Sequence, residues 1–196
     1  MNLPERTGDQ RRIGVAIEVP APYGPRLQEA RAVVGDPLAS SIPPHITILG
    51  PTTLEPDEVD EVEEHLRQVA AAQHPFMTRL RGTGTFRPVS DVVFVQVAEG
   101  IAECEALEAR IRTGPLSRER RFHYHPHVTV AHDVPAPALD EAFENLAAFE
   151  AVFTVTALHM YEHGVDDVWR PIRTFEFGVP APVGPPRDDT SERQRS

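Results

Sequence analysis

The sequence is poor in three features that would each point to a particular class of protein: cysteine, basic residues and long apolar runs. Cys104 is the only cysteine among 196 residues, so a framework of intrachain disulfides is excluded and a reducing compartment is expected. No apolar run approaches the about 18 residues of a membrane span, and residues 1–12 lack the apolar core of a signal peptide. We therefore expect a cytoplasmic protein that does not associate with a membrane.

The shortage of basic residues bears on possible partners. Lys and Arg number 19 against 30 Asp and Glu, which gives a formal net charge of −11. A groove that follows a nucleic-acid duplex needs the opposite sign, so extended duplex binding is not expected. Seven carboxylates and no basic residue lie within residues 55–64, a pattern typical of a solvated helix start. This composition is compatible with a small anionic ligand held at a few points.

Apolar periodicity predicts alternating strands and helices between residues 13 and 177. Strands are expected at 13–19, 45–49, 76–86, 92–97, 127–131, 152–161 and 168–177. Helices are expected at 25–34, 56–72, 101–111 and 137–149. Residues 1–12 are expected to be flexible, and residues 180–196, rich in proline and mixed charge, are expected to be disordered.

The predicted elements repeat, because residues 13–86 and 92–161 share the order strand, helix, short strand, helix, strand. The short strands carry a common signature, Pro-His-[Ile/Val]-Thr-[Ile/Val], at residues 44–48 and 126–130, 82 positions apart. We therefore predict one bilobal α+β domain over 13–179, with the two repeats as lobes and 168–178 as a closing strand. Each lobe is expected to be an antiparallel sheet packed with helices, with one His-x-Thr strand beside a central cleft.

The repeated motif suggests a chemical role. Residues i and i+2 of a strand face the same side, so His45 projects with Thr47 and His127 with Thr129. In-line displacement at phosphorus needs a proton acceptor behind the attacking oxygen and a proton donor behind the leaving oxygen. Two facing histidines meet that need, and the hydroxyls can donate hydrogen bonds to the non-bridging phosphate oxygens. Nothing in the motif requires a metal or a cofactor.

The paired motifs resemble the two-histidine (2H) phosphoesterase superfamily, and especially its branch of bacterial 2'-5' RNA ligases and 2',3'-cyclic phosphodiesterases. The resemblance covers residues 13–178 and is supported by Gly84-Thr85-Phe86 before the strand at 92–97. In RNA ligase-like members an arginine commonly follows the second motif, at the position of His132 in this chain.

The resemblance implies that His45 and His127 are catalytic, that Thr47 and Thr129 bind the phosphate, and that no metal takes part. The implied reaction is hydrolysis of a cyclic phosphodiester to a phosphomonoester, with 2'-5' RNA ligation as its reversal. The expected partner is a small cyclic nucleotide or an RNA end that carries a cyclic phosphate. We expect the protein to act as a monomer.

Two alternatives remain open from the sequence. One is a binding module of the same fold that recognises a nucleotide or an RNA end without turning it over. The other is a metal-dependent hydrolase, because His123, His125 and His127 alternate and an extended chain would place three imidazoles on one face, a spacing that can bind zinc.

Overall fold

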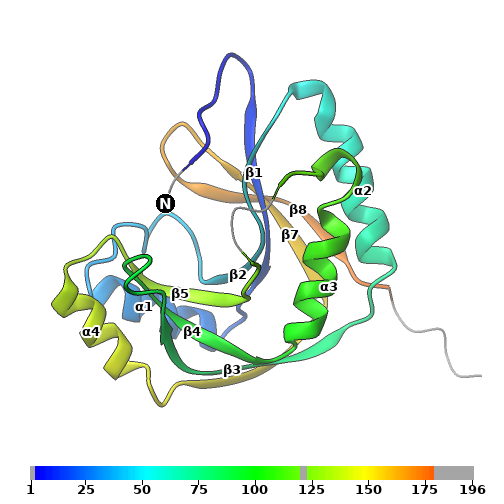
Figure 1. Ribbon diagram of the computed structural model, residues 1–196. Helices are drawn as coiled ribbons and strands as arrows, with labels where there is room; N and C mark the ends of the chain where they lie inside the picture. The colour runs from blue at the N-terminus through cyan, green and yellow to red at the C-terminus, as the bar shows by residue number, and fades with distance from the viewer. Residues whose placement is uncertain (1–2, 120–122, 179–196) are drawn as a thin grey trace, which may run out of the picture.

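The computed structural model describes residues 3–119 and 123–178, and within them the chain forms two four-stranded antiparallel sheets and four α-helices (Figure 1). The strands are β1 (Arg11–Glu18), β2 (His45–Leu54), β3 (Phe76–Thr85), β4 (Val92–Glu99), β5 (His127–His132), β6 (Glu150–Val155), β7 (Ala157–His163) and β8 (Trp169–Glu176). The helices are α1 (Tyr23–Val33), α2 (Val59–Ala71), α3 (Ile101–Ile111) and α4 (Ala136–Asn145). The predicted two-lobed α+β class is confirmed.

Each sheet has helices packed against it. Sheet A has the order β2-β1-β7-β8 and is packed against by α2 and α3, while sheet B has the order β5-β4-β3-β6 and is packed against by α1 and α4. We call these two assemblies lobe A and lobe B. Most of their buried apolar side chains join in one continuous core. No helix in the described part of the chain is long and apolar enough to cross a membrane.

Helix α2 illustrates how the local sequence sets an element. It follows a 3-10 turn at Pro56–Glu58, where Glu55 and Glu58 exchange hydrogen bonds in a capping box. Its apolar residues recur at three- and four-residue steps, so they form one stripe that is buried against the protein. The buried residues of this stripe are Val59, Val62, Leu66, Val69 and Ala70. The predicted helix at 56–72 thus combines the 3-10 turn with α2.

The sheets do not follow the two sequence repeats, and the predicted assignment of 13–86 to one lobe and 92–161 to the other needs correction. Strand β3 ends the first repeat but lies in sheet B, between β4 and β6. Strand β7 ends the second repeat but lies in sheet A, between β1 and β8. The exchange of β3 has a local cause, since a short loop at 86–91 brings β3 and β4 together as neighbouring antiparallel strands.

The segment predicted as one strand at 152–161 is two strands in different sheets. The chain leaves sheet B after Val155, and Thr156 separates β6 from β7. Strand β6 pairs with β3, whereas β7 pairs with β1 and with β8, so the predicted closing hairpin with 168–177 is formed by β7 alone. One continuous run of β-forming residues therefore contributes one strand to each lobe.

The two motif strands share a β-bulge. The partners of β2 on β1 skip Ile48, and the partners of β5 on β4 skip Val130. A bulge places two residues opposite one, so side-chain alternation shifts by one residue beyond it. Both strands accordingly show the same order of half-buried and buried residues, and Gly50 and His132 return to the half-buried face of the motif.

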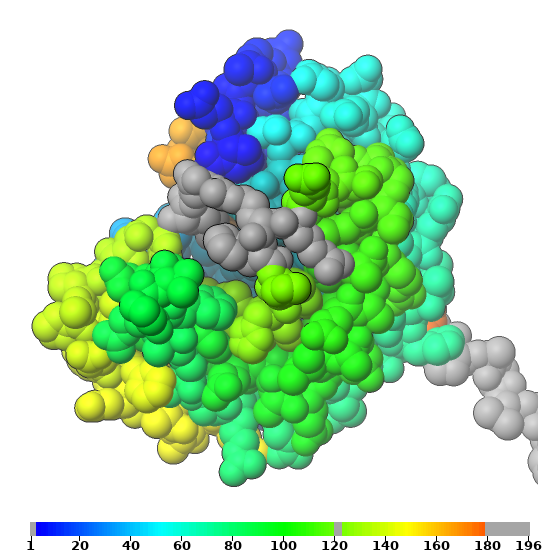
Figure 2. Space-filling view, viewed as in Figure 1, coloured from blue at the N-terminus to red at the C-terminus, as the bar shows by residue number. Residues whose placement is uncertain are grey.

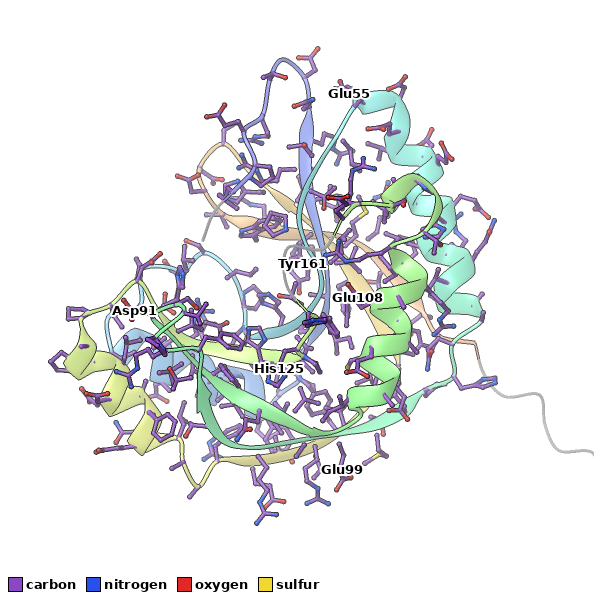
Figure 3. All side chains as sticks on the ribbon, in the orientation of Figure 1. Glu55, Asp91, Glu99, Glu108, His125 and Tyr161 are labelled. Atoms are coloured by element: carbon purple, nitrogen blue, oxygen red, sulfur yellow. The ribbon has the colours of Figure 1, made fainter. Side chains whose placement is uncertain are left out.

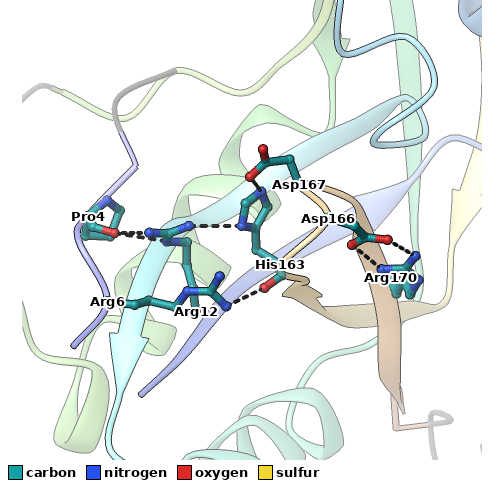
Figure 4. A network of polar contacts seen from close by, with 7 residues as sticks. All are labelled: Pro4, Arg6, Arg12, His163, Asp166, Asp167 and Arg170. Carbon is teal, nitrogen blue, oxygen red and sulfur yellow. Dashed lines mark hydrogen bonds and ion pairs between the residues drawn. The ribbon is translucent and has the colours of Figure 1, made fainter. Parts of the chain in front are cut away.

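Residues 3–10, predicted to be flexible, make defined contacts with lobe A (Figure 4). The Arg12 guanidinium donates to the Pro4 carbonyl from Nε at 3.0 Å and to Nδ1 of the buried His163 at 2.9 Å. Arg6 donates to the His163 carbonyl at 2.9 Å. Figure 2 shows this blue segment on the surface beside the orange turn between β7 and β8. The predicted disordered tail at 180–196 lies outside the described residues.

Candidate active site

The two motif strands meet at the edges of their sheets. Strand β2 is an edge of sheet A, β5 is an edge of sheet B, and the two contact each other. Their histidines and threonines are half-buried on one face. The alternate residues are buried on the other face: Ile46, Ile48, Val128 and Val130, each at most 1% exposed. Burial of these four side chains fixes the direction in which the histidines and threonines point.

His45 is held by hydrogen bonds at both ring nitrogens. Its Nδ1 lies 2.7 Å from the Pro43 carbonyl oxygen. A carbonyl can only accept a hydrogen bond, so Nδ1 carries the proton, and Nε2 of the neutral ring is an acceptor. Nε2 lies 3.1 Å from Thr47 Oγ1, whose hydroxyl donates to it. The nitrogen available for chemistry is therefore Nε2, next to the motif threonine.

His127 repeats the first half of this geometry. Its Nδ1 lies 2.7 Å from the carbonyl oxygen of His125, again two residues earlier in the chain. Nε2 is therefore the free acceptor of this ring also. Two phenylalanines contact the ring: Phe86 edge-on, with centroids 5.0 Å apart and an interplanar angle of 88°, and Phe94 at 5.1 Å. These aromatic contacts restrict the orientation of the imidazole.

Both histidines favour the neutral form. The pKa of His45 is lowered to about 4, chiefly by burial; the Pro43 hydrogen bond acts in the opposite direction, and the charges of Arg31 and His127 act in the same direction as burial. Burial also lowers the pKa of His127, as does the neighbouring charge of His125. His127 is among the charges that act on His45, so the two motif histidines lie within electrostatic range of each other. A bound phosphate would raise both pKa values, since an anion stabilises imidazolium.

A small open pocket adjoins His45 on sheet A. It is lined by β1, β2, β7 and β8 and includes Thr47, Tyr161 and Trp169. Burial raises the pKa of Tyr161 to about 12, so this side chain remains a phenol. Trp169 lies against Gly14, where a Cβ would come within 3.3 Å of the indole. Figure 3 shows Tyr161 and His125 in the central region between the two sheets.

Two side chains near the motif were not identified from the sequence. The Tyr124 hydroxyl donates to the backbone carbonyl of Thr47 at 3.0 Å and so joins the segment before β5 to strand β2. Arg31, at the end of α1, donates to the Ile42 carbonyl at 3.0 Å. The repeat offers no signal for either contact, because both residues lie outside the copied five-residue motif.

The alternative zinc site is not formed. Within residues 3–119 and 123–178, no three His, Cys, Asp or Glu side chains are placed to hold a metal ion. The rings of His125 and His127 lie side by side with centroids 6.2 Å apart, and His123 is exposed. The alternation of these histidines therefore does not converge on one point, and Pro126 interrupts the strand that would be needed.

The site can be compared with known proteins once its geometry is defined. A model of the 2'-5' RNA ligase superfamily matches residues 19–167, which include both motifs. The chain belongs to the 2'-5' RNA ligase superfamily. The match covers most of the chain and confirms the predicted family.

Sequence relatives of this superfamily member carry the name "Putative phosphoesterase". One from Halalkalibacterium halodurans is 29% identical over 151 residues, which cover 73% of this chain and 84% of the relative. One from Bacillus pumilus is 30% identical over 145 residues, with coverage of 73% and 84%. These relatives indicate phosphoesterase chemistry in general.

Solved structures share the superfamily fold. LigT of E. coli, crystallised with 3'-AMP, superposes with a TM-score of 0.63 at 18% identity and covers 86% of this chain and 99% of LigT. TT0787 of Thermus thermophilus has a TM-score of 0.59 at 22% identity, with coverage of 85% and 97%. At these identities the likeness extends to the fold alone, and it confirms the two-lobed architecture.

His132 stands where the resemblance described above implies an arginine, and it ends strand β5. His132 lies on the half-buried face of β5, and its Nδ1 lies 2.9 Å from a carboxylate oxygen of Asp133. Burial lowers its pKa, while the carboxylates of Asp133 and Asp36 act in the opposite direction. The charge of the side chain at this position therefore depends on pH.

Proposed function

We propose that this protein hydrolyses a cyclic phosphodiester, such as a 2',3'-cyclic nucleotide or RNA end, to a phosphomonoester by acid-base catalysis from His45 and His127. The observation that supports this most strongly is the matched geometry of the two rings. Each Nδ1 is fixed on the carbonyl two residues earlier, which leaves each Nε2 as the acceptor nitrogen, and the two rings come from edge strands that contact each other. Each lobe thus contributes one proton-transfer group.

The proposed reaction moves two protons. A neutral imidazole accepts a proton from water as the water oxygen attacks phosphorus, and a phosphorus–oxygen bond of the ring breaks on the opposite side. The other histidine, protonated when the anion binds, donates its proton to the departing oxygen. The product is a phosphomonoester with a free neighbouring hydroxyl. When an RNA 5'-hydroxyl replaces water, the same displacement forms a 2'-5' linkage.

Thr47 and Thr129 are proposed to bind the non-bridging phosphate oxygens. Both are half-buried on the histidine face of their strands. A hydroxyl can donate to an oxygen whose charge grows during the displacement, which stabilises the transition state more than the bound substrate. The Thr47 hydroxyl now donates to His45 Nε2 at 3.1 Å, so it must rotate toward the ligand when phosphate binds.

The proposed substrates are small. LigT has been crystallised with 3'-AMP and with ATP, so the shared fold accommodates mononucleotides. The net charge of −11 disfavours a duplex and is compatible with a ligand held at a few points. Action on an RNA end that carries a cyclic phosphate, a cytoplasmic location and a monomeric state belong to the same proposal.

The test is a chromatographic screen of 2',3'-cyclic nucleotides, ADP-ribose 1'',2''-cyclic phosphate and 2'-5'-linked oligonucleotides, which identifies each monoester product. We expect turnover of at least one cyclic phosphate, a bell-shaped dependence of rate on pH and full activity after exhaustive chelation. Tight binding without turnover of any compound would establish a binding module instead. Activity that chelation removes and zinc restores would show that metal-free acid-base catalysis is not the mechanism.

A further inference from the structure

A buried ion pair lies behind the His45 half of the site. Arg31 is 3% exposed and Asp36 is 4% exposed. Arg31 Nε donates to Asp36 Oδ2 at 3.0 Å, and Asp36 Oδ1 accepts from the Leu38 amide at 2.8 Å. Burying two charges has a large desolvation cost, so such a pair seldom contributes net stability over an apolar pair of the same size. Its placement therefore points to a role other than stability.

The second contact of Arg31 leads to the catalytic motif. Nη1 of Arg31 donates to the Ile42 carbonyl at 3.0 Å. Ile42 is bonded to Pro43, whose own carbonyl accepts the proton of His45 Nδ1 at 2.7 Å. Residues 43 and 44 are both proline and have no amide N–H, so they are held only through their carbonyls: Pro43 accepts from His45, and Pro44 accepts from the Val19 amide at 3.2 Å.

Arg31 also connects the two lobes. It lies on α1, which packs against β5 of lobe B, whereas Ile42 packs in a cluster with Tyr161 and Trp169 of lobe A. The guanidinium has a rigid fork geometry, so one group can bind the carboxylate and the carbonyl at fixed angles. Movement of the Ile42 carbonyl would turn the next peptide, and with it the carbonyl that orients the imidazole.

We propose that Arg31 is a positioning residue for His45: held by Asp36, its guanidinium fixes the Ile42 peptide and thereby the Pro43 carbonyl that orients the imidazole. The catalytic consequence rests on the function proposed above, whereas the orientation of the ring does not. Arg31 does not contact the reacting atoms in this scheme. It acts through the 42–45 segment.

The charge of Arg31 has a second effect on the same ring. It lowers the pKa of His45, in the same direction as burial. The other titratable groups around His45 are His127 from β5, Tyr161 from β7 and Glu18, its cross-strand partner on β1. His127 also lowers the pKa of His45, so Arg31 and His127 both favour the neutral ring.

Two sets of variants separate geometry from charge. Arg31→Lys keeps the charge and one bond to Asp36, but a lysine ammonium lacks the fork that also reaches Ile42. Arg31→Met combined with Asp36→Asn removes both charges, leaves no unpaired buried ion and keeps an oxygen for the Leu38 amide. The matched control is Arg11→Met with Glu162→Gln, an ion pair between β1 and β7 that has no hydrogen bond to residues 42–45.

The readouts are kcat and KM on the cyclic phosphate turned over by the wild type, and the NMR signal of the His45 Nδ1 proton with its pH titration. We expect kcat to fall about 10- to 100-fold in both Arg31 variants, with KM nearly unchanged, because misplacement of a catalytic group affects the chemical step. The Nδ1 proton should exchange faster in both. Only the charge-free double variant should show a raised pKa of His45, and the control should match the wild type.

Each outcome decides the proposal. Unchanged Nδ1 exchange and unchanged kcat in a folded Arg31→Lys protein would overturn it, whatever the double variant does. If the double variant fails to fold, Arg31→Lys still tests the positioning contact, since it leaves Asp36 paired. A wild type that turns over no cyclic phosphate would refute the proposed function, and the NMR comparison would still decide whether Arg31 orients His45.

Discussion

The His45 and His127 halves of the site carry the same motif in different surroundings. Nε2 of His45 contacts the Thr47 hydroxyl and the ring lies near a buried arginine, whereas His127 is packed by Phe86 and Phe94. Within the described residues, Nε2 of His127 has no hydrogen-bond partner. The common part is the Nδ1 bond to the carbonyl two residues earlier.

The comparison shows what duplication preserves and what it leaves free to change. The preserved part is the five-residue motif with its bulge, which sets the direction of the histidine and the threonine. The changed part is the segment before the motif, Ile42-Pro43 in one copy and Tyr124-His125 in the other. Two rings with equal geometry and unequal neighbours are suited to unequal protonation, which acid-base catalysis requires.

Removal of either imidazole has the largest expected effect. We expect His45→Ala and His127→Ala each to lower kcat by about 10³-fold, because each removes one proton transfer. The double variant should be little worse than either single one, since the two groups act as a unit. Steady-state kinetics on circular-dichroism-matched proteins measures this. Near wild-type activity of either variant would show that the histidine removed is not needed for catalysis, and the two halves of the site would then not have equivalent roles.

The pH dependence of stability should distinguish the His45 half. The folded-state pKa of His45 is about 4, below the ordinary value of 6.5, so protonation favours the unfolded chain. Stability is full above about pH 6.5 and is lost as pH falls toward 4, by about 2 to 3 kcal/mol from this residue. Urea unfolding at pH 7 and pH 4.5 should show a smaller loss in His45→Gln than in the wild type. The exposed His74→Gln variant is the control, and equal losses in both variants would contradict the assignment.

Local elements were predictable because the apolar residues of the sequence recur with the periods of helices and strands. The helix at 101–111 was predicted with the observed bounds, and the alternation of His45 with Thr47 follows from the period of a strand. The exchange of β3 and β7 was not predictable, because periodicity indicates a strand but not its partner. Thr156, where the chain passes from one sheet to the other, has ordinary strand propensity, so the break there carries no local signal.

The candidate site could be proposed from the sequence only as far as the repeat extends. The paired histidines and threonines were found because the motif occurs twice, and apolar residues on the opposite face hold them in place. Contacts from Arg31 and Tyr124 reach the motif across tertiary structure, at separations of 11 and 77 residues. No spacing rule connects residues so distant, so these contacts require coordinates.

The two threonines should differ in a smaller but measurable way. Thr47→Val and Thr129→Val each remove a hydroxyl proposed to bind phosphate, and we expect kcat/KM to fall about tenfold in both. Thr47→Val also removes the donor to His45 Nε2, so it should raise the pKa of His45, because that donor favours the neutral ring. Proton NMR titration of both variants checks the difference. The same His45 titration in both would show that the Thr47 contact has no influence.

The smallest expected effect concerns the hydrogen bond by which Tyr124, next to the His127 half, contacts strand β2 of the His45 half. Tyr124→Phe removes the hydrogen bond to the Thr47 carbonyl, so the free energy of unfolding should fall by about 1 kcal/mol and kcat by a few-fold. Tyr23→Phe, which removes a hydroxyl from α1, is the matched control. If both variants lose the same small amount in both measurements, the Tyr124 contact does not set the distance between β2 and β5.

The central claim is that both histidines address one phosphate, and NMR of ¹⁵N-labelled imidazoles during titration with 3'-AMP tests it most directly. The product-like ligand should shift the Nε2 signals of His45 and His127 along one binding curve, with one dissociation constant, and raise the pKa of both rings. The exposed His74 serves as the internal reference and should not respond. A response from one histidine alone, or two curves with different constants, would contradict the account.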